Sequence, residues 1–203
     1  MNHIEQLSNL KNRYYAMRHG QSMANCEGII VSKPVNGVND YGLSEEGRNQ
    51  VKRSVEDHLQ LNTNHLNTDT LIFCSDFKRT CETAKQAHAH LQCSTSVVSD
   101  KRLRERNFGD FELTPDKNYQ IVWTNDGEDG AHTLNNVESA ESVMQRATQL
   151  LLSLEKNYQD KTILLVAHGD TLQILQAAFK KQTASMQRML THLETAEIRQ
   201  LVL

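Results

Sequence analysis

The sequence predicts a three-layer α/β/α sandwich, in which a mostly parallel sheet carries helices on both faces. Short continuous apolar runs at 14–17, 71–74 and 163–167 are typical of strands that are buried on both sides. Segments with helical spacing of apolar residues lie between these runs, and alternating strands and helices form parallel sheets. No linker rich in Pro, Gly or Ser and no internal repeat divides the chain, which predicts a single domain over 1–203.

The first helix of the sandwich is predicted after Ser44. The dozen residues at the N-terminus are polar and weakly periodic, which predicts only a short leading helix or a tail. The Ser44 side chain is a good N-cap, and Glu45 and Glu46 suit the positive end of the helix dipole. The apolar face of this helix comprises Val51, Val55 and Leu59.

Three more helices and a last strand complete the pattern. Ser75 is predicted to cap a helix whose apolar positions are Phe77, Cys81, Ala84 and Leu91. A long helix is predicted from about Val137 to Tyr158, with an apolar stripe of Val143, Ala147, Leu150, Leu151 and Leu154. The last helix follows Gly169 and carries Leu172, Leu175 and Phe179 on its apolar face. The run Ile198–Leu203 predicts the final strand.

The segment 107–136 departs from this alternation. Its periodicity is poor, it holds the only tryptophan, Trp123, and we expect the Gly- and Asp-rich stretch 126–130 to form a turn. We therefore expect an excursion from the α/β core that serves as a lid or insertion. The loop from Gln21 to Gly42 is also long, and long loops in compact domains tend to be functional.

Composition excludes several function classes. The chain has 22 Lys and Arg against 25 Asp and Glu, a net charge of −3, which argues against a generic nucleic-acid or anionic-membrane binder. No stretch approaches the ~20 apolar residues of a membrane span, and the N-terminus has no apolar signal region. The four cysteines form no CxxC pair, and together these features predict free thiols and a cytoplasmic location.

Residues suited to an anion follow three of the predicted strands. Arg18 and His19 follow the first, Ser75 and then Arg79 follow the second, and His168 with Gly169 follows the third. Ligands of open α/β sheets bind at the carboxyl ends of the strands, so we expect these residues to share one pocket. Guanidinium groups and helix N-termini bind phosphate, and a neutral imidazole can accept a phosphoryl group covalently.

These motifs resemble those of the histidine phosphatase (phosphoglycerate-mutase-like) superfamily. The stretch Arg18-His19-Gly20-Gln21-Ser22-Met23-Ala24-Asn25 is similar to its R-H-G-[EQ]-S-x-x-N signature. Five further family motifs follow in the expected order, and their counterparts here are 42–47, 75–84, 103–109, 138–146 and 167–169. The resemblance covers nearly the whole chain from Tyr14 onward.

The resemblance implies a role for each matching residue. His19 would be the nucleophile that becomes phosphohistidine, and Glu105 would protonate the leaving oxygen and later activate water. The phosphoryl oxygens would be held by Arg18, Arg79 and a protonated His168, with Asn25 and Gly169 close by. Read alone, Glu105 belongs to the charged run 101–106, which would usually be a solvated face, and either histidine could be structural. The predicted activity is metal-independent hydrolysis of a small phosphomonoester metabolite, without a cofactor.

Two other functions remain open at this point. Mutases of the same family resemble R-H-G-E-S-x-W-N, whereas Gln21 and Ala24 stand here where Glu and Trp would be, and the chain ends soon after its last predicted strand. Both features favour a phosphatase over a phosphoglycerate mutase. A protein that only binds phosphorylated ligands would not need the acid Glu105. Neither the identity of the monoester nor the oligomeric state follows from the sequence, because specificity would lie in 21–42 and 107–136.

Overall fold

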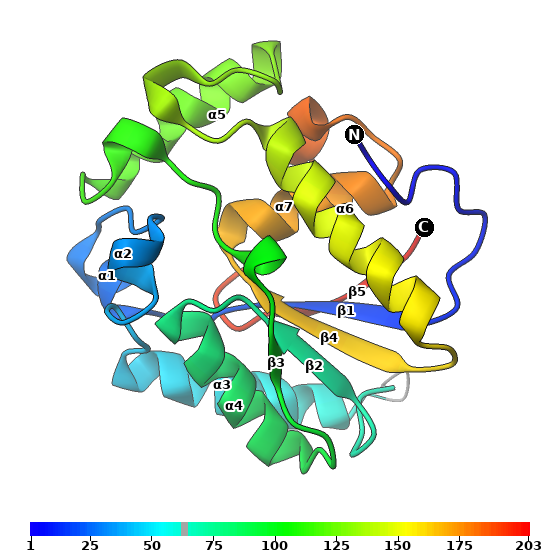
Figure 1. Cartoon of the computed structure of the whole chain (residues 1–203). Helices are drawn as coiled ribbons and strands as arrows, with labels where there is room; N and C mark the ends of the chain where they lie inside the picture. Colours follow the sequence, from blue (N-terminus) through cyan, green and yellow to red (C-terminus); the bar gives the residue numbers. More distant parts are fainter. Residues whose placement is uncertain (62–64) are drawn as a thin grey trace.

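The computed structural model describes residues 1–61 and 65–203 and contains a five-stranded sheet of order β3-β2-β4-β1-β5 (Figure 1). Its strands are β1 (Arg13–Arg18), β2 (Leu71–Cys74), β3 (Val98–Ser99), β4 (Thr162–Ala167) and β5 (Ile198–Leu201). Strands β1 to β4 pair in parallel, and β5 lies antiparallel to β1 at one edge. The two-residue β3 was not predicted, since its side chains are exposed and leave no apolar pattern.

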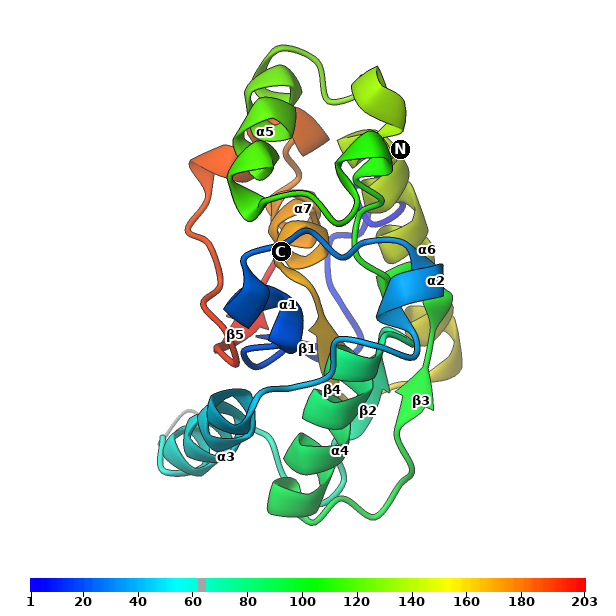
Figure 2. The same cartoon turned by 90° about the vertical axis from the view of Figure 1, so that its left-hand side faces the viewer.

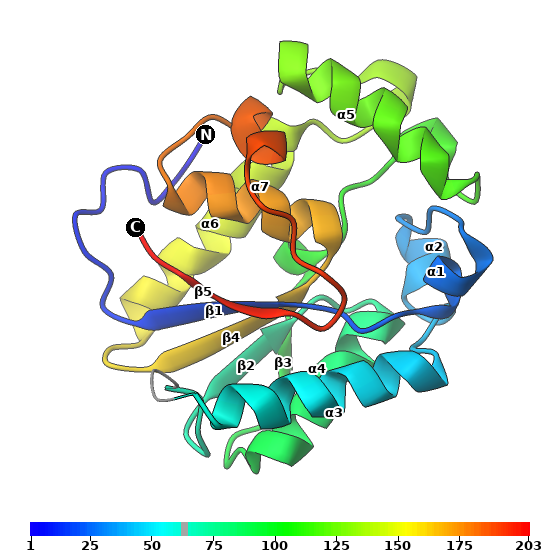
Figure 3. The same cartoon turned by 180° about the vertical axis from the view of Figure 1, so that it is seen from behind.

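Helices cover both faces of this sheet, as Figures 2 and 3 show. One face packs against α3 (Glu45–Leu59) and α4 (Lys78–Leu91), and the other against α6 (Ala140–Asn157) and α7 (Gly169–Phe179). Successive residues of a strand point to opposite faces, so Tyr14 of β1 belongs to the α6/α7 layer and Tyr15 to the α3/α4 layer. The predicted three-layer α/β/α sandwich is confirmed.

The caps and stripes of the helices agree with the prediction at most positions. Ser44 caps α3, where its Oγ accepts a hydrogen bond from the backbone N–H of Gly47 at 3.0 Å. Val51 and Val55 are fully buried, but Leu59 is 43% exposed, so the apolar stripe ends one turn before the helix does. The long helix begins at Ala140 rather than near Val137, because Ser139 caps it there. Its five predicted stripe residues are all buried.

Two predictions of local structure are wrong. Ser75 does not cap α4, since Phe77 occupies the N-cap position and the Ser75 hydroxyl bonds with His168 instead. The stretch 126–130 is not simply a turn, because its first three residues belong to helix α5 (Tyr119–Glu128). Asp126 is fully buried there, in an ion pair with Arg106, and this long-range partner leaves no local signal.

Short elements join the main layers. The first dozen residues form turns rather than a helix, and Ile4 is fully buried in the core. The Gln21–Gly42 loop contains two short helices, α1 (Met23–Glu27) and α2 (Pro34–Gly37). The 3₁₀ turns are η1 (Lys101–Leu103), η2 (Gly109–Phe111), η3 (Asp116–Asn118), η4 (Leu134–Asn136) and η5 (Ala184–Met189).

Two sequence-level expectations concern the environment of the protein. All four cysteines are free thiols in the structure, and they are Cys26, Cys74, Cys81 and Cys93. Among the described residues, no helix is both long enough and apolar enough to cross a membrane.

Candidate active site

The sheet register brings the two predicted histidines together. Arg18 pairs with Ala167 in parallel register, and the His19 N–H donates to the Ala167 carbonyl at 3.0 Å, so His19 and His168 leave adjacent strands side by side. Their rings meet edge to face with centroids 5.3 Å apart. Ser75 leaves β2 on the other side of β4, where its N–H donates to the Val166 carbonyl. The expected convergence at the carboxyl ends of the strands is therefore present.

Glycine allows the loop after β1 to approach helix α3. A Cβ atom on Gly20 would lie 2.4 Å from the carbonyl oxygen of Gly47, and one on Gly47 would lie 2.0 Å from that of Gln21. Both distances are too short for any side chain. The pair Gly20 and Gly47 thereby fixes the backbone that carries His19 against the start of α3.

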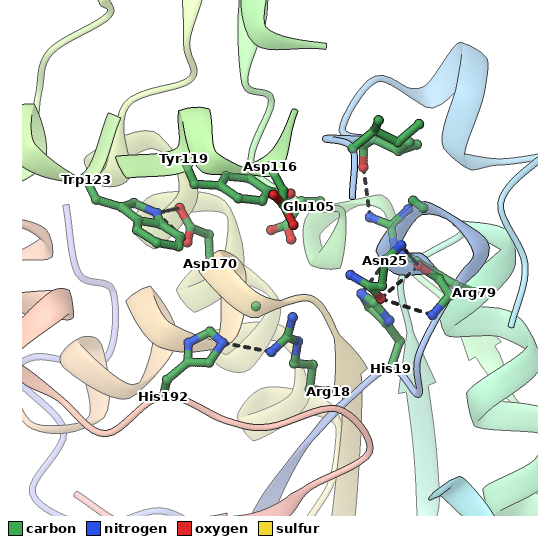
Figure 4. Close-up of a pocket in the computed structure, with 15 residues that line it drawn as sticks. Arg18, His19, Asn25, Arg79, Glu105, Asp116, Tyr119, Trp123, Asp170 and His192 are labelled. Atoms are coloured by element: carbon green, nitrogen blue, oxygen red, sulfur yellow. Dashed lines mark hydrogen bonds between the residues drawn. The ribbon is translucent and has the colours of Figure 1, made fainter. Parts of the chain in front are cut away.

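A pocket of about 210 Å³ opens where these segments meet (Figure 4). Six of the seven predicted site residues line it, namely Arg18, His19, Asn25, Arg79, Glu105 and Gly169. The seventh, His168, is fully buried behind His19 and does not line the pocket. Residues that were not predicted as site residues form much of the remaining wall, and they include Asp116, Tyr119, Trp123, Asp170 and His192.

Hydrogen bonds define the tautomer of His19. The imidazole Nδ1 lies 2.8 Å from the Gly20 carbonyl oxygen, which can only accept, so Nδ1 carries the proton. The other nitrogen, Nε2, accepts a hydrogen bond from Arg79 Nε at 3.1 Å and therefore presents its lone pair. Burial and the charges of Arg79 and Arg18 hold the pKa of His19 well below its ordinary value. The ring is thus neutral, as a nucleophile must be.

Three buried nitrogen atoms beside His19 have no hydrogen-bond partner among the described residues. They are Arg18 Nε, Arg79 Nη1 and His168 Nδ1. Each group is held by its other atoms: Arg18 donates to the Leu193 carbonyl, Arg79 to the Val31 carbonyl, and His168 Nε2 bonds with the Ser75 hydroxyl at 2.9 Å. Buried polar atoms rarely lack partners, so three together indicate a ligand with several acceptor oxygens.

The structure corrects the expected charge of His168. Burial, together with the charges of Arg79 and other cations, holds its pKa well below the ordinary value. The ring is therefore neutral before a ligand binds, and it can act as a hydrogen-bond donor but not as a fixed positive charge. Arg18 and Arg79 supply the fixed charge of the site.

Glu105 is buried, unlike a member of a solvated charged run. One carboxyl oxygen, Oε1, accepts hydrogen bonds from the backbone N–H of Arg106 at 2.9 Å and from the N–H and hydroxyl of Thr171 at 3.3 Å. Burial and the nearby charge of Asp170 raise the pKa of Glu105. Because Oε1 is occupied by donors, the proton of the acid form belongs on Oε2.

Arg146 holds the backbone around Glu105. Its guanidinium donates to the carbonyl oxygens of Arg102, Arg104 and Glu105 at 2.7, 2.8 and 3.3 Å. It is itself fixed by Glu138, whose carboxylate accepts its Nε–H at 2.8 Å. The motifs at 103–109 and 138–146 therefore form one unit that positions the carboxyl group.

A buried charge network supports the opposite wall of the pocket. Arg106 makes a bidentate ion pair with Asp126, with N–O distances of 2.6 and 2.8 Å. It also lies 3.5 Å from Asp170. The indole N–H of Trp123 donates to Asp170 at 3.0 Å, and Arg188 stacks on the indole ring with its Cζ 3.7 Å from the ring centre. Burial raises the pKa of Asp170, and the charges of Arg106 and Arg188, which it faces, oppose this increase.

Asn25 has a local structural role in addition to its place in the pocket. Its Oδ1 accepts hydrogen bonds from the N–H and the hydroxyl of Ser22, which caps α1. This leaves the amide nitrogen as the group with which Asn25 could reach a ligand.

Comparison with known proteins agrees with this geometry. The model of the histidine phosphatase superfamily (branch 1) matches residues 14–203. The chain belongs to this superfamily. It is 30% identical over 185 residues to the "Probable phosphoglycerate mutase GpmB" of Erwinia tasmaniensis, covering 87% of this chain and 78% of that protein.

Solved structures of this superfamily share the fold. The mycobacterial glucosyl-3-phosphoglycerate phosphatase in complex with VO3 superposes with a TM-score of 0.74 and 26% identity, covering 93% of this chain and 91% of that one. Bacillus stearothermophilus YhfR gives a TM-score of 0.73 and 25% identity, covering 93% and 90% of the two chains.

The pKa shifts of His19 and Glu105 predict how the rate of His19 phosphorylation depends on pH in this member of the histidine phosphatase superfamily. Phosphorylation of His19 by an alkyl phosphate requires a neutral imidazole and a protonated Glu105. The rate should fall as pH rises through the raised pKa of Glu105, and fall as pH drops through the lowered pKa of His19. Asp170→Asn removes a charge that raises the pKa of Glu105, so the upper limb of the single-turnover pH–rate profile should move to lower pH.

Comparison with the unaltered enzyme removes the effect of the substrate's own titration, which is common to both proteins. Asp110→Asn provides a control, because it removes an exposed carboxylate of the excursion 107–136 that does not line the pocket. An upper limb that stays in place in Asp170→Asn, or that moves to higher pH, would contradict the assigned coupling.

Proposed function

We propose that this protein hydrolyses a phosphomonoester of a small metabolite through a phosphohistidine intermediate on His19. The observation that carries the proposal is the set of unpartnered buried nitrogens on Arg18, Arg79 and His168, three residues that adjoin the neutral His19. A transferring phosphoryl group places charge on three oxygen atoms, and fixed donors that face them stabilise its transition state. Membership of the histidine phosphatase superfamily supports the same reaction.

In the first step, the Nε2 lone pair of His19 attacks phosphorus. The N–P bond forms as the bond from phosphorus to the leaving oxygen breaks, and Glu105 transfers its Oε2 proton to that oxygen. Arg79 Nε–H occupies the same lone pair at 3.1 Å, so substrate binding must first draw Arg79 onto a phosphoryl oxygen. The bound anion thereby frees the nucleophile.

In the second step, the ionised Glu105 takes a proton from water, and the water oxygen attacks phosphorus. The N–P bond breaks, inorganic phosphate leaves, and His19 and Glu105 return to their starting protonation states. No group of three or more His, Cys, Asp or Glu within 1–61 and 65–203 is arranged to hold a metal ion. The proposed steps use only the side chains of the pocket.

The segment 107–136 is proposed to act as a lid or insertion of a single domain. It supplies Asp116, Tyr119 and Trp123 to the pocket, and α5 lies above the carboxyl ends of the strands in Figure 1. A cover of this kind would limit the access of bulk water to the phosphohistidine.

We propose a cytoplasmic location, which is compatible with four free thiols.

A panel of phosphomonoesters tests this function. We expect phosphate release from nitrophenyl phosphate, full activity in excess EDTA, and inhibition by vanadate, which mimics five-coordinate phosphorus. A mutase would convert 3-phosphoglycerate to its isomer faster than it released phosphate, and a pure binding protein would turn over nothing. Activity that is lost in EDTA and restored by zinc or magnesium would contradict the proposed mechanism.

A further inference from the structure

The end of the pocket away from the phosphoryl site is built from the excursion and the helix start at α7. In Figure 4, Tyr119, Trp123, Asp116 and Asp170 lie across the cavity from Arg18 and His19. The rings of Tyr119 and Trp123 are stacked, with an interplanar angle of 6° and centroids 5.3 Å apart. The alcohol part of a bound monoester would meet this wall once its phosphoryl group lay at His19.

Asp116 is held at the rim of this wall by its backbone. Its N–H donates to the Gly28 carbonyl at 2.8 Å, and Ile30 exchanges hydrogen bonds with the same stretch of the excursion, through Thr114 and Leu113 at 2.9 and 2.8 Å. Asp116 is exposed, and its carboxylate makes no ion pair or hydrogen bond to the described residues. An exposed carboxylate without a protein partner therefore stands on a fixed backbone at the rim, where the leaving group would lie.

No lysine or arginine of the described residues lines this end of the pocket. Arg106 is paired with Asp126, and Arg188 stacks on Trp123 and lies 3.7 Å from Asp170, so neither lines the pocket. Arg18 and Arg79 are at the phosphoryl end. The remaining candidate is His192, and burial and the charge of Arg18 lower its pKa to about 4, so it is neutral near pH 7.

We infer that the leaving group of the substrate carries no negative charge and presents hydroxyl or ammonium donors to Asp116. A carboxylate in the leaving group would meet Asp116 at the exposed rim with no lysine or arginine of the pocket lining beside it, and two like charges repel each other. The aromatic wall accommodates the carbon skeleton of the alcohol. This inference rests on the proposed phosphatase function, and it disfavours carboxylate-bearing monoesters such as phosphoglycerates.

Glycerol 3-phosphate and 3-phosphoglycerate form a matched pair for the test. They share a carbon skeleton and an alkoxide leaving group, and they differ in a terminal hydroxymethyl against a carboxylate. We expect kcat/KM for glycerol 3-phosphate to exceed that for 3-phosphoglycerate by about ten- to a hundredfold at low ionic strength. The ratio should shrink as salt is added, because the rim is open to solvent and its charge is screened.

Asp116→Asn keeps the shape of the side chain and removes its charge, so the ratio should fall by at least about threefold. Glu128→Gln is the matched control, since it removes an exposed carboxylate at the end of α5 that does not line the pocket. In this control, the ratio of kcat/KM for glycerol 3-phosphate to that for 3-phosphoglycerate should equal the ratio of the unaltered protein.

Three results would overturn the inference: equal or better use of 3-phosphoglycerate, a ratio unchanged in Asp116→Asn, or no turnover of either alkyl ester while nitrophenyl phosphate is hydrolysed. Nitrophenyl phosphate separates this failure from failure of the phosphatase function. If it too is not hydrolysed, the proposed function falls, and the inference falls with it.

Discussion

Replacement of Glu105 by Gln is expected to slow phosphorylation of His19 by an alkyl phosphate by ~10²–10⁴-fold. An alkoxide is a strongly basic leaving group and needs the proton that Glu105 holds on Oε2. Nitrophenolate leaves as a stable anion and needs much less help, so the loss on nitrophenyl phosphate should be far smaller. The glutamine keeps the size of the side chain and can still accept the hydrogen bonds from Arg106 and Thr171.

This comparison requires single-turnover measurements, because Glu105 also serves as the base in the second step and could mask the difference at steady state. Arg79→Ala is the contrasting variant. It removes charge stabilisation that both substrates need, so it should slow the two to a similar extent. Equal losses on the two substrates for Glu105→Gln would show that the proton comes from another group.

The sequence was sufficient to predict the sandwich because its core elements are strongly patterned. Strand β4 is buried at every position, and helix α6 carries a clear apolar stripe that packs against the sheet. Such patterns survive in tertiary context because burial of the apolar face stabilises the same element that the pattern predicts. The exposed β3 and the end of α3 lack that support. As a result, β3 was not predicted, and Leu59 was wrongly placed on the buried face of its helix.

The phosphoryl end of the pocket was predictable for a different reason. Arg18, His19, Ser75 and His168 directly follow strands, so parallel topology alone brings them to one edge of the sheet. Arg79 was expected there because it closely follows the second strand, whereas Glu105 was found through the motif resemblance. The charge of His168 was not predictable, because its pKa depends on burial behind His19.

The wall formed by the excursion could not be predicted from local patterns. Asp126 and Arg106 are separated by 20 residues and pair only after α5 has folded back over the core. Asp170 and Trp123 are 47 residues apart. The one usable signal was Trp123 itself, the only tryptophan, in a segment of poor periodicity. Side-chain partners at such separations are set by tertiary packing, so they leave no local signal in the sequence.

Replacement of His19 by Ala is expected to lower phosphatase activity by at least about 10⁴-fold, because the nucleophile is lost while the anion-binding groups remain. The decisive measurement is to trap the intermediate itself. The unaltered protein would be mixed with a ³²P-labelled phosphomonoester, quenched in alkaline denaturant within a single turnover, and digested to locate the label. His90→Ala, which replaces a histidine of α4 outside the pocket, is the control.

We expect label that is stable to base, labile to acid and located on the peptide that contains His19. The same label should form in His90→Ala and be absent from His19→Ala. Label that survives acid, as a serine or threonine phosphate does, or label that persists in His19→Ala, would contradict the assignment of His19 as the phosphoryl acceptor.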